Sequence, residues 1–366
     1  MPTDIVQFGT SRFLQAHVDL FVSEASSEPR ITVVQTTGSG QSARRVAAFN
    51  HGAFPVRLRG LSQGVVIDRT VEVHSVSRGL AADRDWAEIE AIVTGEARVL
   101  LSNTGDSGYE LDPGDRPEGA LPRSFPAKLT RLLMARHRQG GDPLDIYPCE
   151  LISGNGDTLR RIVLALADQW ELSPAFRDWA GRECRWVNSL VDRIVSTPIE
   201  PVGAVAEPYA LWAIGAQPGL EPPCRHPDIV VTDRLDDYER LKLFILNLGH
   251  SALVEAWRRN GAPEGFTVRD AMADPRLRSA LDSLYDQEVL PVFGAIGQGD
   301  QAEAYRVTTL ERFANPFLEH RLADIADNHD AKLERRFRPL IALAEAHAPD
   351  LLQPRLRETL ARMKQA

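Results

Sequence analysis

One segment of the chain, residues 238–250, combines an apolar helical pattern with polar side chains that can move protons and bind oxygen atoms. At about 100° per residue, its apolar arc consists of Leu241, Phe244, Ile245 and Leu248. The side chains that can do chemistry fall together on the other face: Glu239, Lys242, Asn247 and His250. Further leucines lie among them, so we expect this helix to be buried almost all round.

Lys242 has the clearest chemical use in this helix. Apolar surroundings disfavour the charged ammonium and lower the pKa of a lysine toward neutrality. A neutral amine can accept the proton of an alcohol as hydride leaves for a nicotinamide, and the ammonium can return a proton to a ketone. The Asn247 amide can stabilise the charge that develops on the reacting oxygen, and His250 can orient a neighbouring hydroxyl. Alternatively, this is a core helix whose polar residues only hydrogen-bond to an adjacent domain.

A second pattern in the same helix has to be weighed. Tyr238 and Lys242 stand four residues apart, which is also the spacing of the Tyr/Lys pair in short-chain dehydrogenases. That class also has a glycine-rich Thr-Gly-x-x-x-Gly-x-Gly turn after its first strand. Residues 9–13 of this chain read Gly-Thr-Ser-Arg-Phe and lack it. The sequence therefore favours a lysine acting without the tyrosine.

The cysteines and histidines give no metal-binding pattern. Cys149, Cys184 and Cys224 are widely spaced, with no Cys-x-x-Cys pair, and the sequence contains no His-Glu-x-x-His. Neither a disulfide framework nor a zinc site is predicted. If the chain oxidises alcohols, we expect it to activate the hydroxyl without a metal.

The N-terminal part alternates short apolar runs with helical patterns. Residues 4–8 form an apolar run that ends at Gly9, and a helical period follows over 13–21. Further β-rich runs occur at 31–34 and 98–101. This alternation predicts an α/β fold with a Rossmann-like, doubly wound parallel sheet.

The turn that begins at Gly9 is a candidate for binding a dinucleotide. Such turns use glycines so that the backbone can approach the pyrophosphate, which sits at the N-terminus of the next helix. Only Gly9 is in place here, so an ordinary strand-to-helix turn is the alternative. Residues 35–37, after the second strand, read Gln-Thr-Thr where an acidic residue would favour NAD. We expect NAD as the cofactor, with NADP left open.

The C-terminal part has a different pattern. Residues 198–227 are rich in proline and glycine and contain one aromatic patch, around Trp212, that fits an edge strand. Long helical periods follow at 238–256, 276–289 and from 316 to the end. We therefore expect a dinucleotide-binding domain over residues 1–232 and a mostly α-helical substrate domain over residues 233–366.

The composition limits the class of protein. A chain of 366 residues exceeds the usual size of one hydrophobic core, which agrees with two domains. A net charge of -9 with dispersed basic residues argues against a nucleic-acid partner. There is no apolar run long enough to span a membrane and no signal peptide pattern, so a cytoplasmic protein that acts on small molecules is expected.

Taken together, these segments resemble the mannitol dehydrogenase family of long-chain polyol and hexuronate dehydrogenases. Helix 238–250 is similar to the family signature, including the glutamate three residues before the lysine. Residues 186–194 resemble its Asn-Ser-Met-Val-Asp-Arg-Ile segment. The turn 102–104 resembles the loop by which the family touches its cofactor, and 312–316 a C-terminal hallmark. The resemblance runs over nearly the whole chain.

The resemblance implies a role for each matching residue. Lys242 would be the acid/base, Asn188 and Asn247 would stabilise the substrate oxygen, His250 would position the substrate, and Glu239 would relay protons to solvent. The implied cofactor-binding residues are Gly9, Ser11, Arg12, Phe13 and Asn103. Lys332 matches a basic residue that binds substrate, and no metal is implied.

Within the family, residues 5–9, 125–133, 148–152 and 155–157 resemble the tagaturonate reductases, also called altronate oxidoreductases. The expected substrate is thus a sugar acid and its keto form.

Several departures keep other substrates open. Asn188 is the residue of polyol dehydrogenases, where tagaturonate reductases tend to have serine, and Asp324 stands where polyol dehydrogenases commonly place an arginine. The chain is also shorter than most members. A mannitol-like or arabinitol-like polyol is the first alternative, and a nicotinamide-binding sensor that has lost catalysis is the second. No oligomeric state is predicted.

Overall fold

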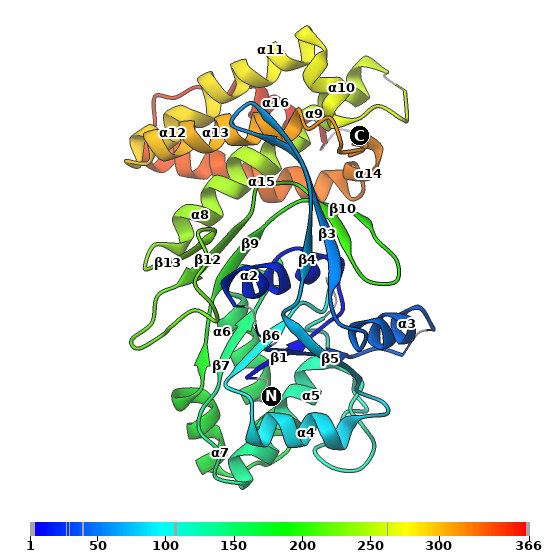
Figure 1. Cartoon of the computed structure of the whole chain (residues 1–366). Coiled ribbons are helices and arrows are strands. Elements are labelled where there is room, and N and C mark those ends of the chain that lie inside the picture. The colour runs from blue at the N-terminus through cyan, green and yellow to red at the C-terminus, as the bar shows by residue number, and fades with distance from the viewer. Residues whose placement is uncertain are drawn as a thin grey trace. The chain divides into compact units, whose positions relative to one another are not determined.

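The computed structural model describes residues 4–26, 28, 30–38, 40–105, 108–261 and 263–363 (Figure 1). They form two compact units. Unit 1 comprises the described residues of Met1–Leu58, Arg69–Ala206 and Ala210–Leu235, and unit 2 those of Arg59–Asp68, Glu207–Tyr209 and Asp236–Ala366. The sequence suggested one division, between residues 232 and 233, and gave no sign that two short N-terminal stretches pack with the C-terminal unit.

Unit 1 is built on a six-stranded sheet in the order β5-β2-β1-β6-β7-β8. The strands are β1 (Ile5–Phe8), β2 (Ile31–Gln35), β5 (Val76–Ala81), β6 (Val99–Ser102), β7 (Asp145–Pro148) and β8 (Arg185–Trp186). All neighbours pair in parallel. The strand order reverses between β1 and β6, the point at which such sheets bind ligands. The predicted Rossmann-like sheet is confirmed.

Helices cover both faces of this sheet because successive residues of a buried strand point to opposite sides. In β1, Ile5 belongs to one hydrophobic cluster and Val6 to the other. The helices that contribute to the Ile5 cluster are α1 (Arg12–Gln15), α2 (Val18–Ala25) and α3 (Gly40–Phe49). Those of the Val6 cluster are α4 (Trp86–Gly95), α5 (Phe125–Arg138), α6 (Asn155–Gln169), α7 (Pro174–Asp178) and the π-helical turn η1 (Trp179–Glu183).

Two smaller sheets hold the remaining strands. One has the order β10-β11-β3-β4 and consists of β3 (Phe54–Ser62), β4 (Val65–Val73), β10 (Val195–Pro198) and β11 (Ala204–Ala206). The other has the order β13-β12-β9, with β9 (Ser189–Asp192), β12 (Leu211–Gly215) and β13 (Ile229–Thr232). The edge strand expected around Trp212 was wrong: β12 is paired on both sides and Trp212 is fully buried. The prolines of this region flank the strand and do not interrupt its hydrogen bonds.

Asp19 is a fully buried carboxyl group in α2. Its carboxylate accepts a long hydrogen bond of 3.5 Å from Nε2 of Gln7, and burial raises the pKa of Asp19 from 3.8 to about 7. Between these two values the native state keeps a proton that the unfolded chain releases. The free energy of unfolding therefore falls as the pH rises through this interval, by roughly 4 kcal/mol at most.

Replacing Asp19 by asparagine, which cannot ionise, should remove this pH dependence. We expect Asp19→Asn to be about as stable as the wild type near pH 4 and more stable than it above about pH 7. Urea denaturation of both proteins across this range measures the difference. A gap that does not widen with rising pH would show that Asp19 is ionised in the native state.

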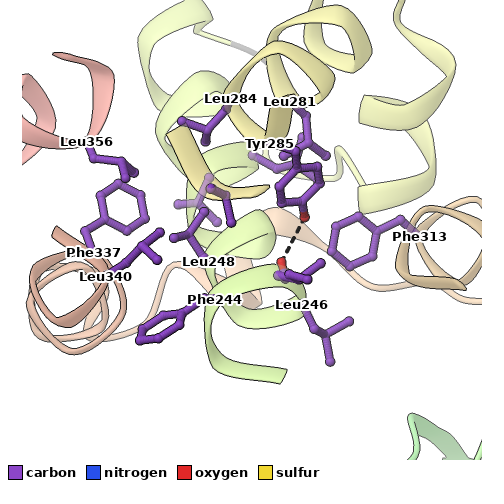
Figure 2. Packing of buried hydrophobic residues seen from close by; sticks show 14 of the residues in the cluster. Phe244, Leu246, Leu248, Leu281, Leu284, Tyr285, Phe313, Phe337, Leu340 and Leu356 are labelled. Atoms are coloured by element: carbon purple, nitrogen blue, oxygen red, sulfur yellow. Dashed lines mark hydrogen bonds between the residues drawn. The ribbon is translucent and has the colours of Figure 1, made fainter. Parts of the chain in front are cut away.

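Unit 2 is helical. Its elements are α8 (Leu235–Leu241), η2 (Lys242–Asn247), α9 (Leu248–Asn260), α10 (Val268–Ala273), α11 (Pro275–Leu284), η3 (Tyr285–Val289), α12 (Leu290–Ala295), α13 (Gly299–Phe313), α14 (Leu322–Ile325), α15 (His329–His347) and α16 (Pro354–Met363), where η marks a π-helical turn. They enclose one hydrophobic core, part of which is drawn in Figure 2. The helical C-terminal region is confirmed. The helical period expected from residue 316 to the end is divided among α14, α15 and α16, because Asn328 takes a left-handed conformation and the chain is again non-helical at 348–353.

The tip of the β3–β4 hairpin, residues 59–68, is held in unit 2 by the end of α13. The Glu311 carboxylate accepts hydrogen bonds from the backbone N–H groups of Gln63 and Gly64 at 3.1 and 2.6 Å. Asn315 Nδ2 donates to the Arg59 carbonyl at 3.2 Å. The segment 312–316, noted in the sequence as a family hallmark, thus has a structural role.

Arg312 forms a fully buried ion pair with Glu207, in which the two side chains are 2% and 1% exposed. Nε and Nη2 of Arg312 donate to the carboxylate at 2.8–3.1 Å. The guanidinium also makes a cation–π contact, with its Cζ 4.2 Å from the centroid of the Tyr209 ring. This pair fixes the stretch 207–209 in unit 2.

In the described part of the chain, no helix is both long enough and apolar enough to cross a membrane.

Candidate active site

The turn after β1 meets the turn after β6 at the point where the strand order reverses. Gly9 has a φ of +119°, and a Cβ atom at this position would lie 2.4 Å from the carbonyl oxygen of Asn103. Only glycine permits both this conformation and this close approach. A single glycine therefore lets the two turns pack closely against each other at the switch point, where dinucleotides bind in such folds.

Ser11 and Asn103 complete this turn. Ser11 Oγ caps α1 by accepting from the Leu14 N–H at 3.2 Å, and it donates to Oδ1 of Asn103 at 3.0 Å. Asn103 Nδ2 donates to the Cys149 carbonyl at 2.8 Å, which ties in the end of β7. The structure thus brings the predicted residues Gly9, Ser11 and Asn103 together.

The other two predicted cofactor residues lie on α1. Arg12 is exposed, and the partly buried Phe13 stacks on His17 with ring centroids 4.8 Å apart. They adjoin the Gly9 turn in sequence. Their contact with a cofactor remains a prediction.

Glu150 is a residue at this site that the sequence analysis did not single out. It is buried, and its carboxylate accepts from the Ser102 hydroxyl and from the N–H and hydroxyl of Thr104, each at 3.0 Å. The Tyr109 hydroxyl donates to it at 3.1 Å. Glu150 therefore shapes the loop on either side of Asn103.

Asn188 is held at the N-terminus of α6 by the segment 155–157. The buried Asn155 accepts from the Ser189 N–H at 3.0 Å and donates to the Ser189 carbonyl at 2.9 Å. A Cβ at Gly156 would lie 2.6–2.9 Å from backbone atoms of residues 187 and 188. Asp157 binds the Asn188 side chain itself. Asn155, Gly156 and Asp157 together therefore position Asn188.

The helix that carries the other predicted catalytic residues is not a regular α-helix. Residues Lys242–Asn247 form a π-helical turn, in which the Leu248 N–H donates to the carbonyls of Leu243 and Ile245. A residue and the fifth one after it are about one turn apart in a π-helix, whereas in an α-helix they are about 140° apart. The π-turn therefore brings Lys242 and Asn247 closer to one direction than the regular helix expected from the sequence, in which they lie at opposite edges of the polar face. Both side chains are partly exposed, as is Glu239, so the expected burial all round was wrong for this face.

Side chains from distant helices satisfy carbonyls of this turn. The buried Tyr285 hydroxyl donates to the Ile245 carbonyl at 2.8 Å, as the dashed line in Figure 2 shows. Arg336 Nη1 donates to the Asn247 carbonyl at 2.9 Å and to the Ser251 hydroxyl at 2.8 Å. Burial raises the pKa of Tyr285 and lowers that of Arg336 to about 10. Tyr285 and Arg336 thus stabilise the irregular turn between Lys242 and Asn247.

Gly249 allows Tyr285 to approach the helix. A Cβ at residue 249 would lie 2.0 Å from the Tyr285 hydroxyl oxygen and 3.2 Å from the Phe313 ring. An alanine here has to displace Tyr285 from the Ile245 carbonyl. Gly249 therefore supports the π-turn through packing.

We expect Tyr285→Phe to lower the free energy of unfolding by about 1 kcal/mol, because the Ile245 carbonyl loses one of its two donors. We expect Gly249→Ala to cost a similar amount through overpacking. Both variants should also lower kcat, because the turn that places Lys242 loses a support. Thermal unfolding and steady-state kinetics measure the two effects. Wild-type kcat in both variants would show that the turn does not need Tyr285.

His250 packs against His320, which the sequence analysis missed. The rings of His250 and His320 have centroids 5.0 Å apart. Burial lowers the pKa of His320. The negative charge of Asp324 raises this pKa, and the positive charge of Lys332 lowers it further. Lys332 Nζ donates to the Ile325 carbonyl at 2.8 Å. The pKa of Lys332 is lowered mainly by desolvation and also by the positive charge of Arg336. Lys332 and Arg336, one turn apart on α15, form a basic group in unit 2.

The predicted site residues thus fall into two groups. Unit 1 holds Gly9, Ser11, Arg12, Phe13, Asn103 and Asn188, and unit 2 holds Glu239, Lys242, Asn247, His250 and Lys332. Among the residues that the structure describes, no group of three or more His, Cys, Asp or Glu side chains could hold a metal ion.

The chain matches two family models in succession. Residues 3–222 match the mannitol dehydrogenase Rossmann domain and residues 234–364 the mannitol dehydrogenase C-terminal domain. It is 31% identical to the altronate oxidoreductase of Bacillus subtilis (strain 168), over 93% of this chain and 75% of that protein. It is 32% identical to the altronate oxidoreductase of Klebsiella pneumoniae subsp. pneumoniae, over 98% of this chain and 79% of that protein.

Two solved structures share the fold. A D-sorbitol dehydrogenase in substrate-free form superposes with a TM-score of 0.80 at 21% identity, covering 94% of this chain and 76% of that chain. The Pseudomonas fluorescens mannitol 2-dehydrogenase, solved with NAD and D-mannitol, superposes with a TM-score of 0.75 at 20% identity, covering 94% and 75%.

Proposed function

The chain belongs to the mannitol dehydrogenase family, and we propose that this NAD-dependent oxidoreductase interconverts a sugar acid of the altronate type and its keto form, with Lys242 as acid/base. The family and its relatives support an enzyme that acts on the CH–OH group of a polyol or sugar acid. The choice of a sugar acid, the lysine mechanism and the independence of metal are the proposal.

The Gly9 turn fits a dinucleotide. The turn lies at the sheet's switch point, where Gly9 lets the backbone approach the Asn103 carbonyl and Ser11 binds the Asn103 side chain. NAD bound there would supply the acceptor for the hydride of the substrate carbon. Arg12 and Phe13, which follow on α1, are proposed to contact it as well.

The observation that carries the mechanism is the π-turn Lys242–Asn247. In a π-turn a residue and the fifth one after it lie about one turn apart, which favours a shared direction for the Lys242 amine and the Asn247 amide, and π-turns occur frequently at functional sites. In alcohol oxidation, Lys242 would take the hydroxyl proton, and in ketone reduction it would return it. Asn247 and Asn188 would donate hydrogen bonds to the same oxygen. His250 would position the substrate, and Glu239 would pass the proton on to solvent.

The basic pair on α15 supports a carboxylate-bearing substrate. Arg336 contacts the turn by donating to the Asn247 carbonyl, and Lys332 lies one turn before Arg336 on α15. An ammonium has three N–H groups, and one of those of Lys332 goes to the Ile325 carbonyl. Lys332 is therefore proposed to meet the substrate carboxylate as a point charge. The proposal also includes a cytoplasmic location and no nucleic-acid or membrane partner.

The experiment that tests this function is a substrate panel. The purified, chelator-treated protein is offered NAD or NADP with altronate, other aldonic acids, mannitol and arabinitol, and the absorbance of the reduced nicotinamide is followed. We expect turnover of altronate with NAD. Turnover of polyols alone would contradict a sugar-acid substrate and identify the substrate as a polyol. Cofactor binding without turnover of any substrate would favour a sensor that no longer catalyses.

A further inference from the structure

We propose that Asp157 is a positioning residue that fixes the orientation of the Asn188 amide, so that this amide presents an N–H, and never its oxygen, to the substrate. The proposal rests on the proposed function, in which Asn188 donates to the reacting oxygen. Asp157 itself touches no reacting atom.

The two residues form a reciprocal pair. The backbone N–H of Asp157 donates to Asn188 Oδ1 at 3.0 Å, and Asn188 Nδ2 donates to Asp157 Oδ2 at 2.8 Å. A backbone N–H can only donate and an ionised carboxylate can only accept. Rotating the amide by half a turn would therefore set oxygen against oxygen and N–H against N–H. Asp157 thus selects one of two otherwise similar orientations.

The backbone around the pair is held as well. Asp157 is the third residue of α6, where an acidic side chain is favoured by the helix dipole. On the other side, the Val187 N–H donates to the Ile146 carbonyl at 2.9 Å, and the Asn188 carbonyl accepts from the Gly215 N–H at 2.9 Å. With both backbones fixed, rotation of the amide is the main freedom left to Asn188, and Asp157 removes it.

The selected orientation is the one that catalysis needs. An amide nitrogen carries two N–H groups, and one of those of Asn188 goes to Asp157. The second points away from the carboxylate and can meet a substrate oxygen. A flipped amide would present Oδ1 to that oxygen and repel the charge that develops on it.

Kinetics of single and double variants test the proposal. We expect Asp157→Ala to lower kcat for the substrate about tenfold and to leave the KM for NAD unchanged. This is less than the roughly 100- to 1,000-fold loss for a missing oxygen-binding donor, because the backbone N–H of residue 157 still binds Asn188 Oδ1 in the variant. Asp157→Asn, which offers a donor as well as an acceptor, should recover part of this loss. Asp168→Ala removes an exposed aspartate from the same helix and should leave kcat unchanged.

A double-mutant cycle shows whether Asp157 acts through Asn188. In the Asn188→Ala background, Asp157→Ala should cause no further loss of kcat. Losses that multiply, or wild-type kcat in Asp157→Ala, would overturn the role of Asp157 and leave the proposed function standing. Wild-type kcat in Asn188→Ala would instead overturn the role of Asn188 in the proposed function, and the role of Asp157 with it.

A second readout needs no turnover. With asparagine labelled selectively with nitrogen-15, the Asn188 side-chain amide signal is assigned from its loss in Asn188→Ala. We expect Asp157→Ala to shift this signal and to speed the exchange of its protons with solvent. An unchanged signal and exchange rate would contradict the proposal even if no substrate were known.

Discussion

Replacing Lys242 by alanine is expected to lower kcat by at least about 100-fold, the usual scale for a lost acid/base. The affinity for NAD should change little, because the Gly9 turn and its partners Ser11 and Asn103 belong to the other unit. Steady-state kinetics and a titration of cofactor binding measure the two quantities separately. Wild-type kcat in this variant would eliminate Lys242 as the acid/base.

The chain offers a matched control for this variant. Only four of its 42 basic side chains are lysines, and Lys332 is another of them. Arginine retains a positive charge but does not give up its proton in proteins. Lys332→Arg should therefore keep most of the kcat, because the arginine still provides a positive charge that can bind the substrate carboxylate. A loss of kcat in Lys332→Arg as large as in Lys242→Ala would show that Lys332 has a more specific role.

Replacing Arg312 by methionine is expected to lower the free energy of unfolding by about 3–5 kcal/mol, because it leaves the Glu207 carboxylate buried without its counter-charge. The variant also loses the contact with the Tyr209 ring. The stretch 207–209 should then separate from unit 2 more readily. Urea and thermal unfolding measure the loss.

Two further variants separate the buried charge from the general effect of losing an arginine. Arg306 is on the same helix, and its partners Asp286 and Glu303 are about half exposed, so Arg306→Met should cost at most about 1 kcal/mol. The double variant Arg312→Met with Glu207→Met should recover much of the stability lost in Arg312→Met. Equal losses in Arg306→Met and Arg312→Met would contradict the importance of the buried pair.

Much of the fold was predictable because its signals are local. The apolar runs at 4–8, 31–34 and 98–101 all became buried parallel strands, since a strand covered on both faces needs apolar residues throughout. The β3–β4 hairpin was not predicted. Residues 65–73 of its second strand are mostly exposed, so they lack the alternating apolar pattern that identifies a strand.

The π-turn could not be read from the sequence for a different reason. Apolar periodicity cannot distinguish one irregular turn inside an amphipathic helix. What stabilises this turn is Tyr285, 40 residues after Ile245, and Arg336, 89 residues after Asn247. These contacts depend on the tertiary structure. The four polar residues were found, but their arrangement was not.

The cofactor turn was ambiguous in the sequence because only one of the usual glycines is present. The structure shows what that glycine does: it faces the Asn103 carbonyl, 94 residues further along the chain. Asp157, Glu150 and His320 were missed as site residues because acidic residues and histidines occur throughout the sequence. The scarcity of lysine was a signal that could have strengthened the choice of Lys242, since arginine cannot serve as a base.

The measurement that tests the central claim most directly compares wild type and Lys242→Arg, both treated with chelator, in the oxidation of altronate by NAD. We expect the wild type to turn over undiminished after chelation. The arginine variant should lose at least about 100-fold in kcat, because its side chain keeps the charge but cannot accept the proton. Loss of wild-type activity on chelation, or wild-type kcat in the arginine variant, would contradict a metal-free lysine mechanism.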